Sequence, residues 1–303
     1  TRNLILGAGL AGLSAAFHLP KGESLVVERE REPGGLCRTR LLDGFHFDRT
    51  GHLLHLGKGS VREMVLGLLP RVFRSVERRA CVFSKGVFTG YPFQANTHGL
   101  PPEVIRECVV GFVESLMRKG REEGPGNFRD WILATFGEGF ARHFMLPYNE
   151  KLYRVDLREM ECGWASWSIP RPTLDEVIRG ALGTEVRGLG YNARFLYPRK
   201  GGISCLPEII SARCGTILTG CSVRSVDLRE RRALLEGGES VVYQRLISTL
   251  PLDALLRILH PLPEGISRKV PGKLRAVRVI NVNLGVDRKG VLPCHWAYFP
   301  EPE

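Results

Sequence analysis

Residues 4–19 have the sequence LILGAGLAGLSAAFHL, and this stretch decides the fold. A short apolar run leads into Gly7, Gly9 and Gly12, and then into a segment of helical composition. The spacing G-x-G-x-x-G between a strand and a helix is typical of the turn that holds the pyrophosphate of a dinucleotide. Gly7 permits the tight turn, Gly9 lets a pyrophosphate approach the backbone, and Gly12 lets helix and strand pack closely. The free N–H groups at the helix N-terminus favour an anion there.

A second apolar run, residues 25–27, ends in Glu28. An acid at this distance from the first glycine lies where the ribose hydroxyl of a dinucleotide needs an acceptor. The alternative explanation for an apolar stretch near the N-terminus is a signal peptide. That alternative is disfavoured because glycines interrupt the run at fingerprint spacing and only Arg2 precedes it as a charge. The sequence therefore predicts a dinucleotide-binding βαβ unit.

The residues after this acid distinguish between cofactors. The segment PGGLCR, residues 33–38, adds a glycine pair and Arg38, which an NAD site does not need. With these residues the chain resembles the FAD-binding flavoproteins of the amine oxidase, protoporphyrinogen oxidase, phytoene desaturase and UDP-galactopyranose mutase group. The resemblance implies FAD as the cofactor, with the arginine facing its pyrophosphate. It also implies the following cofactor contacts: Gly7, Gly9, Gly12, Glu28, Gly34, Gly35, Arg38, Gly51 and Val223.

The composition is ordinary for a globular protein, with 303 residues, 43% hydrophobic residues and a net charge of +11. Excess positive charge suits anionic ligands such as FAD or a nucleotide sugar, whereas no basic stripe interleaved with aromatics predicts nucleic-acid binding. No segment has the length of a membrane span, so we expect a cytoplasmic protein without an integral membrane segment. Eight scattered cysteines without a C-x-x-C pair or a Cys/His cluster favour reduced thiols and no metal site. Nothing in the sequence indicates an oligomeric state.

The order of the predicted elements indicates an α/β fold: a Rossmann-type βαβ domain for FAD, an inserted helical region and an antiparallel substrate sheet. Residues 277–284 are predicted to form a strand of that sheet. Because the chain starts at Thr1 and stops soon after a strand-like run, we expect a longer natural protein and a missing C-terminal part of the fold. The expected domains are a discontinuous FAD-binding domain (1–70 and 191–250), the substrate sheet (71–97 and 251–303) and a helical domain (98–190).

A histidine is the candidate catalytic residue. The segment FHFDRTGHLLH, residues 45–55, resembles a segment that lies near the flavin ring in this group of flavoproteins. His52 matches a histidine that the mutases carry there, although Thr50 stands where glycine is common. The alternative for His52 is a packed or surface loop histidine.

Two aromatic segments are the candidates for substrate binding. The sequences YPFQAN (residues 91–96) and FMLPYNEKLY (residues 144–153) are similar to mutase segments, and their aromatic faces and amides suit a nucleotide base. Ordinary aromatic packing is the alternative. The mutases carry a diphosphate-binding arginine where this chain has Ser168. The candidate substrate residues are Tyr91, Phe93, Gln94, Asn96, Phe144, Asn149, Tyr153, Trp164 and Arg171.

The resemblance implies a flavoenzyme for a small-molecule substrate and leaves two reactions open. A mutase-like enzyme would interconvert UDP-galactopyranose and UDP-galactofuranose through flavin N5, without net redox. A redox flavoenzyme resembling amine oxidases or protoporphyrinogen oxidases would take hydride from a bulky substrate, and Thr50 and Ser168 favour this alternative. A non-catalytic binder resembling the Rab escort proteins is disfavoured, because such proteins lose their FAD contacts and this chain keeps Glu28 and Arg38.

Overall fold

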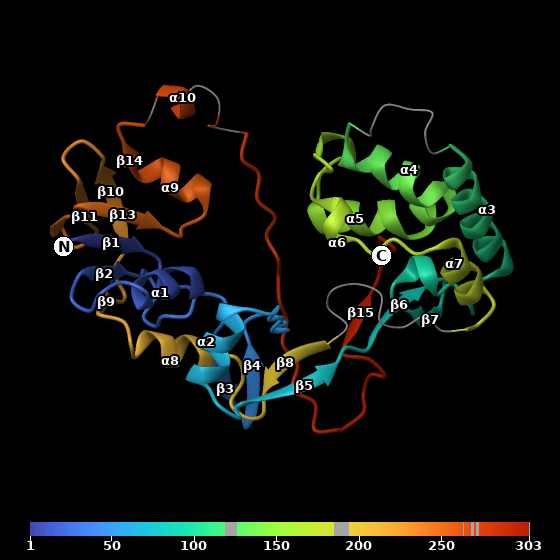
Figure 1. Cartoon of the computed structure of the whole chain (residues 1–303), viewed down its shortest axis with the longest axis horizontal. Coiled ribbons are helices and arrows are strands. Elements are labelled where there is room, and N and C mark those ends of the chain that lie inside the picture. The colour runs from blue at the N-terminus through green and yellow to red at the C-terminus, as the bar shows by residue number, and fades with distance from the viewer. Residues whose placement is uncertain (119–125, 185–193, 263, 268–269, 271–272, 303) are drawn as a thin grey trace. The chain divides into compact units, whose positions relative to one another are not determined.

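The computed structural model describes residues 1–118, 126–184, 194–262, 264–267, 270 and 273–302. These residues form two compact units, each made of two chain segments (Figure 1). The first unit comprises residues Thr1–Val76 and Phe195–Gly285, and the second comprises Glu77–Arg194 and Val286–Glu303.

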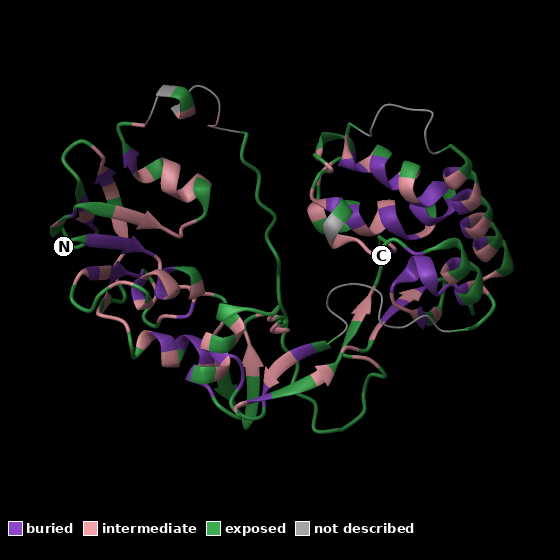
Figure 2. Cartoon of the chain, in the orientation of Figure 1, coloured by how far each residue is buried: buried purple, intermediate pink, exposed green. Residues whose placement is uncertain are grey.

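The first unit contains a four-stranded parallel sheet. The two central strands are linked by helix α1, whose Leu13 packs with Ile5 and Val26 in a fully buried core. Figure 2 shows the burial of β1, which explains why its sequence is a continuous apolar run rather than an alternating one. In spatial order the strands are β13 (Arg245–Ser248), β1 (Asn3–Leu6), β2 (Ser24–Val27) and β9 (Thr216–Leu218), and α1 spans Leu10–Phe17.

A second sheet and several helices complete this unit. Strand β10 pairs antiparallel with β11 and parallel with β14, and α2 and α8 pack beside α1 in the same core. The second sheet consists of β12 (Ser240–Val242), β11 (Arg232–Leu235), β10 (Val223–Asp227) and β14 (Leu259–His260). The remaining elements are α2 (Ser60–Leu68), α8 (Cys205–Ser211), α9 (Leu252–Ile258), α10 (Glu264–Ser267), the hairpin β3 (Thr39–Leu42) and β4 (Phe45–Asp48), and the pair β5 (Phe73–Glu77) and β8 (Arg194–Pro198).

The second unit contains a three-stranded sheet of mixed direction. Strands β6 (Ala80–Ser84) and β7 (Val87–Gly90) form an antiparallel hairpin, whereas β15 (Trp296–Tyr298) joins β6 in parallel. This pairing brings Cys81 beside Cys294, and the two form a disulfide at a sequence separation of 213. The prediction of reduced thiols is therefore wrong for these two cysteines, because it rested on local spacing alone.

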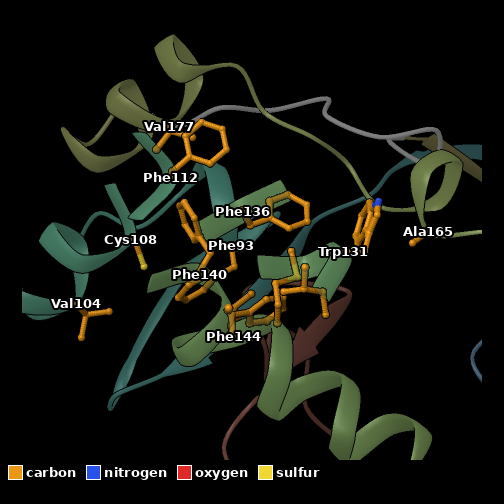
Figure 3. Close-up of a cluster of buried hydrophobic side chains, with 14 of the residues drawn as sticks. Phe93, Val104, Cys108, Phe112, Trp131, Phe136, Phe140, Phe144, Ala165 and Val177 are labelled. Carbon is orange, nitrogen blue, oxygen red and sulfur yellow. The ribbon is translucent and has the colours of Figure 1, made fainter. Parts of the chain in front are cut away.

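The helices of the second unit pack around a phenylalanine-rich core. In Figure 3, Phe93, Phe140 and Phe144 lie close together; the rings of Phe93 and Phe144 stack with centroids 4.8 Å apart. The elements are η1 (Phe93–Ala95), α3 (Pro102–Arg118), α4 (Phe128–Phe140), the π-helix η2 (Ala141–Met145), α5 (Leu146–Tyr153), η3 (Leu157–Glu159), α6 (Ala165–Ser168) and α7 (Leu174–Ala181).

Local sequence fixes the ends of two of these helices. The side chain of Asn127 accepts a hydrogen bond from the backbone N–H of Asp130 at the start of α4. At the start of α7, Thr173 and Glu176 bond to each other's backbone N–H in a capping box. Both starts could be predicted from sequence, because they need only residues within one helical turn.

The structure bears out the predicted α/β class and corrects one element. Residues 277–284 form no strand, and the side chains of Val279, Ile280 and Val282 are exposed. Their alternation with polar residues predicted a strand, yet no described strand pairs with this segment. The predicted division into three domains stays a prediction; hairpin β6–β7 and helices α3–α7 belong to one compact unit. Throughout the described residues, every helix is too short or too polar to cross a bilayer.

Candidate functional site

The turn between β1 and α1 is built of glycines at positions that cannot carry a side chain. Gly7 has a φ angle of +97°, in the left-handed region that favours glycine. A Cβ atom on Gly12 would overlap the carbonyl oxygen of Gly7. Helix α1 begins after Gly9 without a side-chain cap, so no side chain occupies the first N–H groups of the helix. The turn therefore leaves a helix N-terminus open to an anion.

The second glycine pair packs directly on this turn. The backbone N–H of Gly34 donates to the carbonyl oxygen of Ala8 at 2.7 Å. A Cβ atom on Gly35, whose φ angle is +58°, would lie only 3.0 Å from the Cα atom of Gly9. The glycine turn after β1 and the pair Gly34–Gly35, which were both predicted to contact FAD, therefore lie in contact with each other.

Glu28 lies at the end of β2 and is buried, with 8% of its surface exposed. Its carboxylate accepts hydrogen bonds from the backbone N–H of Ala8 at 2.7 Å and of Glu30 at 3.0 Å. The predicted ribose acceptor is therefore fixed against the glycine turn, which places a carboxylate beside the helix N-terminus.

The guanidinium of Arg38 lies across the loop that precedes it. It donates to the carbonyl oxygens of Gly35 at 3.1 Å and Glu32 at 3.4 Å, and to the carboxylate of Glu30 at 3.1 Å. The hydrogen bond from Arg38 lowers the pKa of the Glu30 carboxyl. These hydrogen bonds hold the loop with the glycine pair in place. The sequence predicted only a contact of Arg38 with the pyrophosphate, and not this structural role.

A carboxylate network surrounds the candidate catalytic histidine. Asp48 accepts hydrogen bonds from Thr39 Oγ1 at 2.6 Å, from Tyr197 Oη at 2.7 Å and from the backbone N–H of Ile203 at 3.2 Å. His52 Nδ1 lies 3.8 Å from the Asp48 carboxylate, too far for a hydrogen bond, and among the described residues this buried nitrogen has no hydrogen-bond partner. Asp48 was not among the predicted site residues, although it precedes His52 by only four positions.

Two further predicted cofactor contacts occupy ordinary positions. Gly51 is exposed, immediately before His52. Val223 begins β10, pairs with Leu235 and is half-buried. Their roles at the cofactor stay predictions.

The second unit contains an aromatic pocket with a volume of about 300 Å³. We define the aromatic pocket by its lining residues. They come from the end of the hairpin, from α5, from α6 and the residues after it, and from β15. The residues are Tyr91, Tyr148, Asn149, Leu152, Tyr153, Trp164, Ser168, Ile169, Pro170 and Tyr298.

The aromatic rings of the pocket contact one another. Tyr91 and Tyr298 stack with centroids 4.9 Å apart and an interplanar angle of 15°. Tyr148 meets Tyr298 edge-on at 5.4 Å, and Tyr153 meets Trp164 edge-on at 5.9 Å. Burial raises the pKa of the Tyr91 and Tyr148 hydroxyls, so both stay protonated hydrogen-bond donors.

The polar groups of the pocket are held by backbone contacts. Asn149 is 6% exposed, and its amide nitrogen donates to the carbonyl oxygen of Met145 at 2.7 Å. The indole N–H of Trp164 donates to the carbonyl oxygen of Glu161 at 2.9 Å. The hydroxyl of Ser168 donates to the carbonyl oxygen of Trp164 at 3.2 Å. The pocket thus combines flat aromatic faces with an oriented amide, a combination suited to a planar polar ring.

The structure brings four predicted substrate residues together in this pocket: Tyr91, Asn149, Tyr153 and Trp164. Phe93 and Phe144 belong to the core behind it, where Phe144 stacks on Tyr148 at 5.3 Å.

Three other predicted substrate residues act from outside the pocket. Gln94 is buried and donates to the carbonyl oxygen of Pro170 at 2.7 Å, so it supports the pocket wall. Asn96 is buried and donates to the carbonyl oxygen of Pro92 at 3.1 Å. The guanidinium of Arg171 lies 5.1 Å from the ring centroid of Trp131 and does not line the pocket. Direct contact of these residues with a substrate stays a prediction.

Two lining residues, Tyr148 and Tyr298, were not among the predicted site residues. A signal for Tyr148 was present, because residues 148, 149, 152 and 153 share one face of α5 by helical spacing. Tyr298 lies in an aromatic segment, HWAYF, that resembles a mutase segment, but its place in the pocket depends on the long-range pairing of β15 with β6. Among the described residues, no group of three His, Cys, Asp or Glu side chains is arranged to hold a metal ion.

Comparison with known proteins identifies what this chain resembles. The family model for flavin-containing amine oxidoreductases matches residues 10–298. The crystal structure of a reduced UDP-galactopyranose mutase has a TM-score of 0.80 and 30% identity, over 85% of this chain and 56% of that one.

More distant matches share the fold. A protein assigned as a protoporphyrinogen oxidase from an Exiguobacterium species has a TM-score of 0.59 and 15% identity, over 85% of this chain and 61% of that one. A putrescine oxidase bound to putrescine has a TM-score of 0.52 and 18% identity, over 87% of this chain and 61% of that one. The chain therefore spans between 56% and 61% of the length of these three structures.

Proposed function

Because the chain belongs to the family of flavin-containing amine oxidoreductases, we propose that it is a mutase-like flavoenzyme that interconverts the pyranose and furanose forms of UDP-galactose. FAD is its cofactor. The identity to the mutase, twice that to the protoporphyrinogen oxidase, supports the mutase-like reaction over net redox chemistry.

The glycine turn fits the cofactor. A Cβ atom at Gly12 or Gly35 would fill the cradle, α1 begins without a side-chain cap, and Glu28 provides a carboxylate beside it. We assign the pyrophosphate to the N-terminus of α1 and a ribose hydroxyl to Glu28. When bound, FAD supplies a flavin ring that can exchange hydride or, reduced, act as a nucleophile through N5. His52 is our candidate for a proton-transferring residue, since its buried Nδ1 has no hydrogen-bond partner among the described residues.

The observation that carries the substrate assignment is the aromatic pocket. A uracil ring is planar and presents amide-like edges, so it suits a slot of tyrosines with an oriented asparagine. We therefore propose that the uridine end of the substrate binds between the tyrosines and that Asn149 reads the base. The pocket volume, about 300 Å³, lies in the range of pockets that bind small organic ligands.

A ring-exchange assay tests this proposal. The FAD-loaded protein is reduced with dithionite and supplied with UDP-galactofuranose, and the products are separated by chromatography. We expect UDP-galactopyranose to form catalytically, with many turnovers for each reduction. Absence of ring exchange in a fully reduced, FAD-loaded protein contradicts the proposal.

Net oxidation is the second candidate, and Ser168 favours it. A mutase carries an arginine at this position according to the resemblance, whereas this chain places a neutral hydroxyl on the pocket wall. A neutral hydroxyl at this position, unlike an arginine, does not repel a protonated amine substrate. Oxygen consumption with a putrescine-like amine or a porphyrinogen, and none with UDP-galactofuranose, would select this function instead.

A further inference from the structure

The disulfide between Cys81 and Cys294 joins the two strands at one edge of the three-stranded sheet. Cys81 lies in β6 and is buried, whereas Cys294 stands two residues before β15 and is half-buried. The strand order β15–β6–β7 makes β15 an edge strand, and among the described strands it pairs with β6 alone. Its ladder consists of three residue pairs, which begin at Trp296 and end at Tyr298. The disulfide is therefore a covalent tie at the start of a very short strand.

The chain that leads into β15 is exposed over a long stretch. Every residue of 286–293 is exposed, and the sheet is reached only at the disulfide. Just after it, the backbone N–H of His295 donates to the carbonyl oxygen of Arg79 at 2.7 Å, and His295 Nδ1 accepts from the backbone N–H of Arg79 at 3.1 Å. Because an exposed stretch loses little packing when it moves, the disulfide and these two bonds set where β15 begins.

The chain that follows β15 is held by polar contacts instead. Lys151 Nζ donates to the carbonyl oxygens of Phe299 at 3.2 Å and Glu301 at 2.7 Å. The carboxylate of Glu301 accepts hydrogen bonds from Ser84 Oγ at 2.7 Å and from the backbone N–H of Lys85 at 3.2 Å. These contacts do not involve the disulfide. Opening it therefore loosens β15 from its first residue while the chain beyond its last residue stays attached.

The last residue of β15 forms a wall of the aromatic pocket. Tyr298 stacks on Tyr91 with centroids 4.9 Å apart and meets Tyr148 edge-on at 5.4 Å. Its hydroxyl accepts a hydrogen bond from Arg78 at 2.7 Å. A change in the pairing of β15 would shift this wall, whereas Tyr91 and Asn149 belong to segments that the disulfide does not join. The state of the disulfide is thus linked to the shape of one side of the pocket.

The two sulfurs of the disulfide differ in their exposure to solvent. Cys81 is 9% exposed, whereas Cys294 is half-buried between two exposed neighbours. A thiol from solution therefore reaches Cys294 first. The buried Cys108 of the same unit is excluded as the attacking group, because burial raises the pKa of its thiol to about 12 and only a thiolate attacks a disulfide.

We propose that Cys81–Cys294 is a reversible thiol–disulfide site that controls ligand binding in the aromatic pocket through β15. The co-reactant is a low-molecular-weight dithiol. Its thiolate attacks Cys294 Sγ, the bond between the two cysteine sulfurs breaks, and Cys81 leaves as a thiolate. The second thiol of the dithiol then displaces Cys294 from the mixed disulfide. The protein gains two electrons and two protons, and the dithiol is oxidised to its own disulfide.

Hydrogen–deuterium exchange tests the structural step without a ligand. The FAD-loaded protein is compared before and after treatment with dithiothreitol. Alkylation and mass spectrometry count the thiols, and the visible spectrum verifies that the flavin stays oxidised in both samples. We expect the amides of residues 296–298 to exchange at least about threefold faster in the dithiol form, with the amides of α3 unchanged. Equal exchange in both forms, or a disulfide that dithiothreitol does not open in the folded protein, would overturn the proposal.

Isothermal titration calorimetry then measures the Kd of UDP for the two forms, a probe whose choice rests on the proposed function. We expect UDP to bind about 2- to 10-fold more weakly to the dithiol form, the range for the loss of one aromatic contact. Reoxidation with glutathione disulfide should restore the original Kd. An unchanged Kd in a protein whose β15 exchanges faster would show that this strand does not control the pocket, which also overturns the proposal.

Two variants assign the response to this pair of cysteines. Cys81→Ser with Cys294→Ser is fixed in the open form, so its Kd should equal that of the dithiol form and should not respond to dithiothreitol. Cys162→Ser is the matched control, because Cys162 is half-buried in the same unit and lies outside the disulfide. It should respond as the wild type does. A response to dithiothreitol that persists in the double variant contradicts the assignment. If the double variant does not fold, the two forms of the wild type carry the test.

Failure of the proposed function is distinguishable from failure of this proposal. A wild type that binds no UDP in either form removes the nucleotide assignment, and putrescine then replaces UDP in the titration. The exchange experiment needs no ligand and stays decisive. Faster exchange of residues 296–298 in the dithiol form supports a thiol-controlled wall in a pocket for another substrate, and equal exchange overturns it.

Discussion

The glycine turn of the first unit and the aromatic pocket of the second differ in what builds them. The turn is made of backbone, and its requirements are met by residues between Gly7 and Arg38. The pocket is made of side chains from four separate segments, and Tyr298 arrives from the far end of the chain. A backbone site tolerates almost no added atom, whereas a side-chain site can lose one wall and keep the others. Substitutions in the two regions should therefore have effects of different size and kind.

The largest expected effect is loss of the cofactor by Gly12→Ala. The added Cβ atom would overlap the carbonyl oxygen of Gly7, so the turn and α1 must separate. We expect the FAD content, measured as visible absorbance per protein, to fall at least about tenfold, equivalent to about 1.4 kcal/mol of binding.

Gly67→Ala is the matched control, because Gly67 also lies in a helix but has no atom within 4 Å of an added Cβ. Its FAD content should equal that of the wild type, and its stability should rise by about 0.4–1 kcal/mol. Equal FAD content in both variants would remove the steric argument for the turn.

The next largest effect concerns the disulfide that closes the sheet of the second unit. Cys81→Ser with Cys294→Ser should destabilise the second unit by about 2–4 kcal/mol, because the link no longer restricts the unfolded chain. We expect weaker UDP binding, because β15 with Tyr298 is then held to β6 by strand pairing alone. The FAD content should stay unchanged. Thermal unfolding and calorimetry measure the two effects. A parallel loss of FAD would show that the two regions are not independent.

A smaller effect is expected from Asn149→Ala, which removes the oriented amide from the pocket. The Kd for UDP should rise about 10- to 100-fold, since a polar group of the base is left without its partner. Asn127→Ala is the control: the same change in the same unit removes the cap of α4 and costs about 1 kcal/mol of stability. If both variants bind UDP equally well, Asn149 does not read the ligand.

The smallest effect is the pH dependence of the loop that Arg38 holds. The hydrogen bond from Arg38 lowers the pKa of Glu30 from its ordinary value of 4.5. The folded carboxyl is therefore the stronger acid, and its stabilisation is present above pH 4.5 and lost as the pH falls through the folded pKa. Wild type should retain slightly more FAD than Glu30→Gln at pH 7, and the difference should vanish at lower pH. A difference that grows on acidification would reverse the assigned sign.

Sequence alone predicted the first region better than the second for a physical reason. The strand, turn, helix and acid of the FAD site are adjacent in sequence, and their spacing follows from backbone geometry. Helix α3 was predictable from the helical spacing of its apolar residues, and the aromatic residues of 91–96 and 144–153 were predictable as a site by resemblance. The parallel pairing of β15 with β6, and with it Tyr298 and the disulfide, depends on contacts over more than 200 residues.

Arg78 illustrates the same limit. In the sequence Arg78 is one of several neighbouring arginines. Only the structure distinguishes it from exposed Arg79, because the Arg78 guanidinium contacts Tyr91 and Tyr298. For residues 277–284 the error is of the opposite kind, because the sequence predicted an element that the structure lacks. Their alternation predicts a strand, but a strand exists only when a partner strand pairs with it.

The π-helix η2 has a consequence for how this pocket tolerates insertions and deletions. It continues directly into α5, whose Tyr148, Asn149, Leu152 and Tyr153 face the pocket. Each residue of a helix advances the rotation by about 100°, so removing a single residue from Ala141–Met145 would turn this face away from the pocket. The number of residues in η2 therefore sets the direction in which the pocket-lining side of α5 points. Homologous proteins that share this pocket should conserve the number of residues between Phe140 and Tyr148 more strictly than their identities.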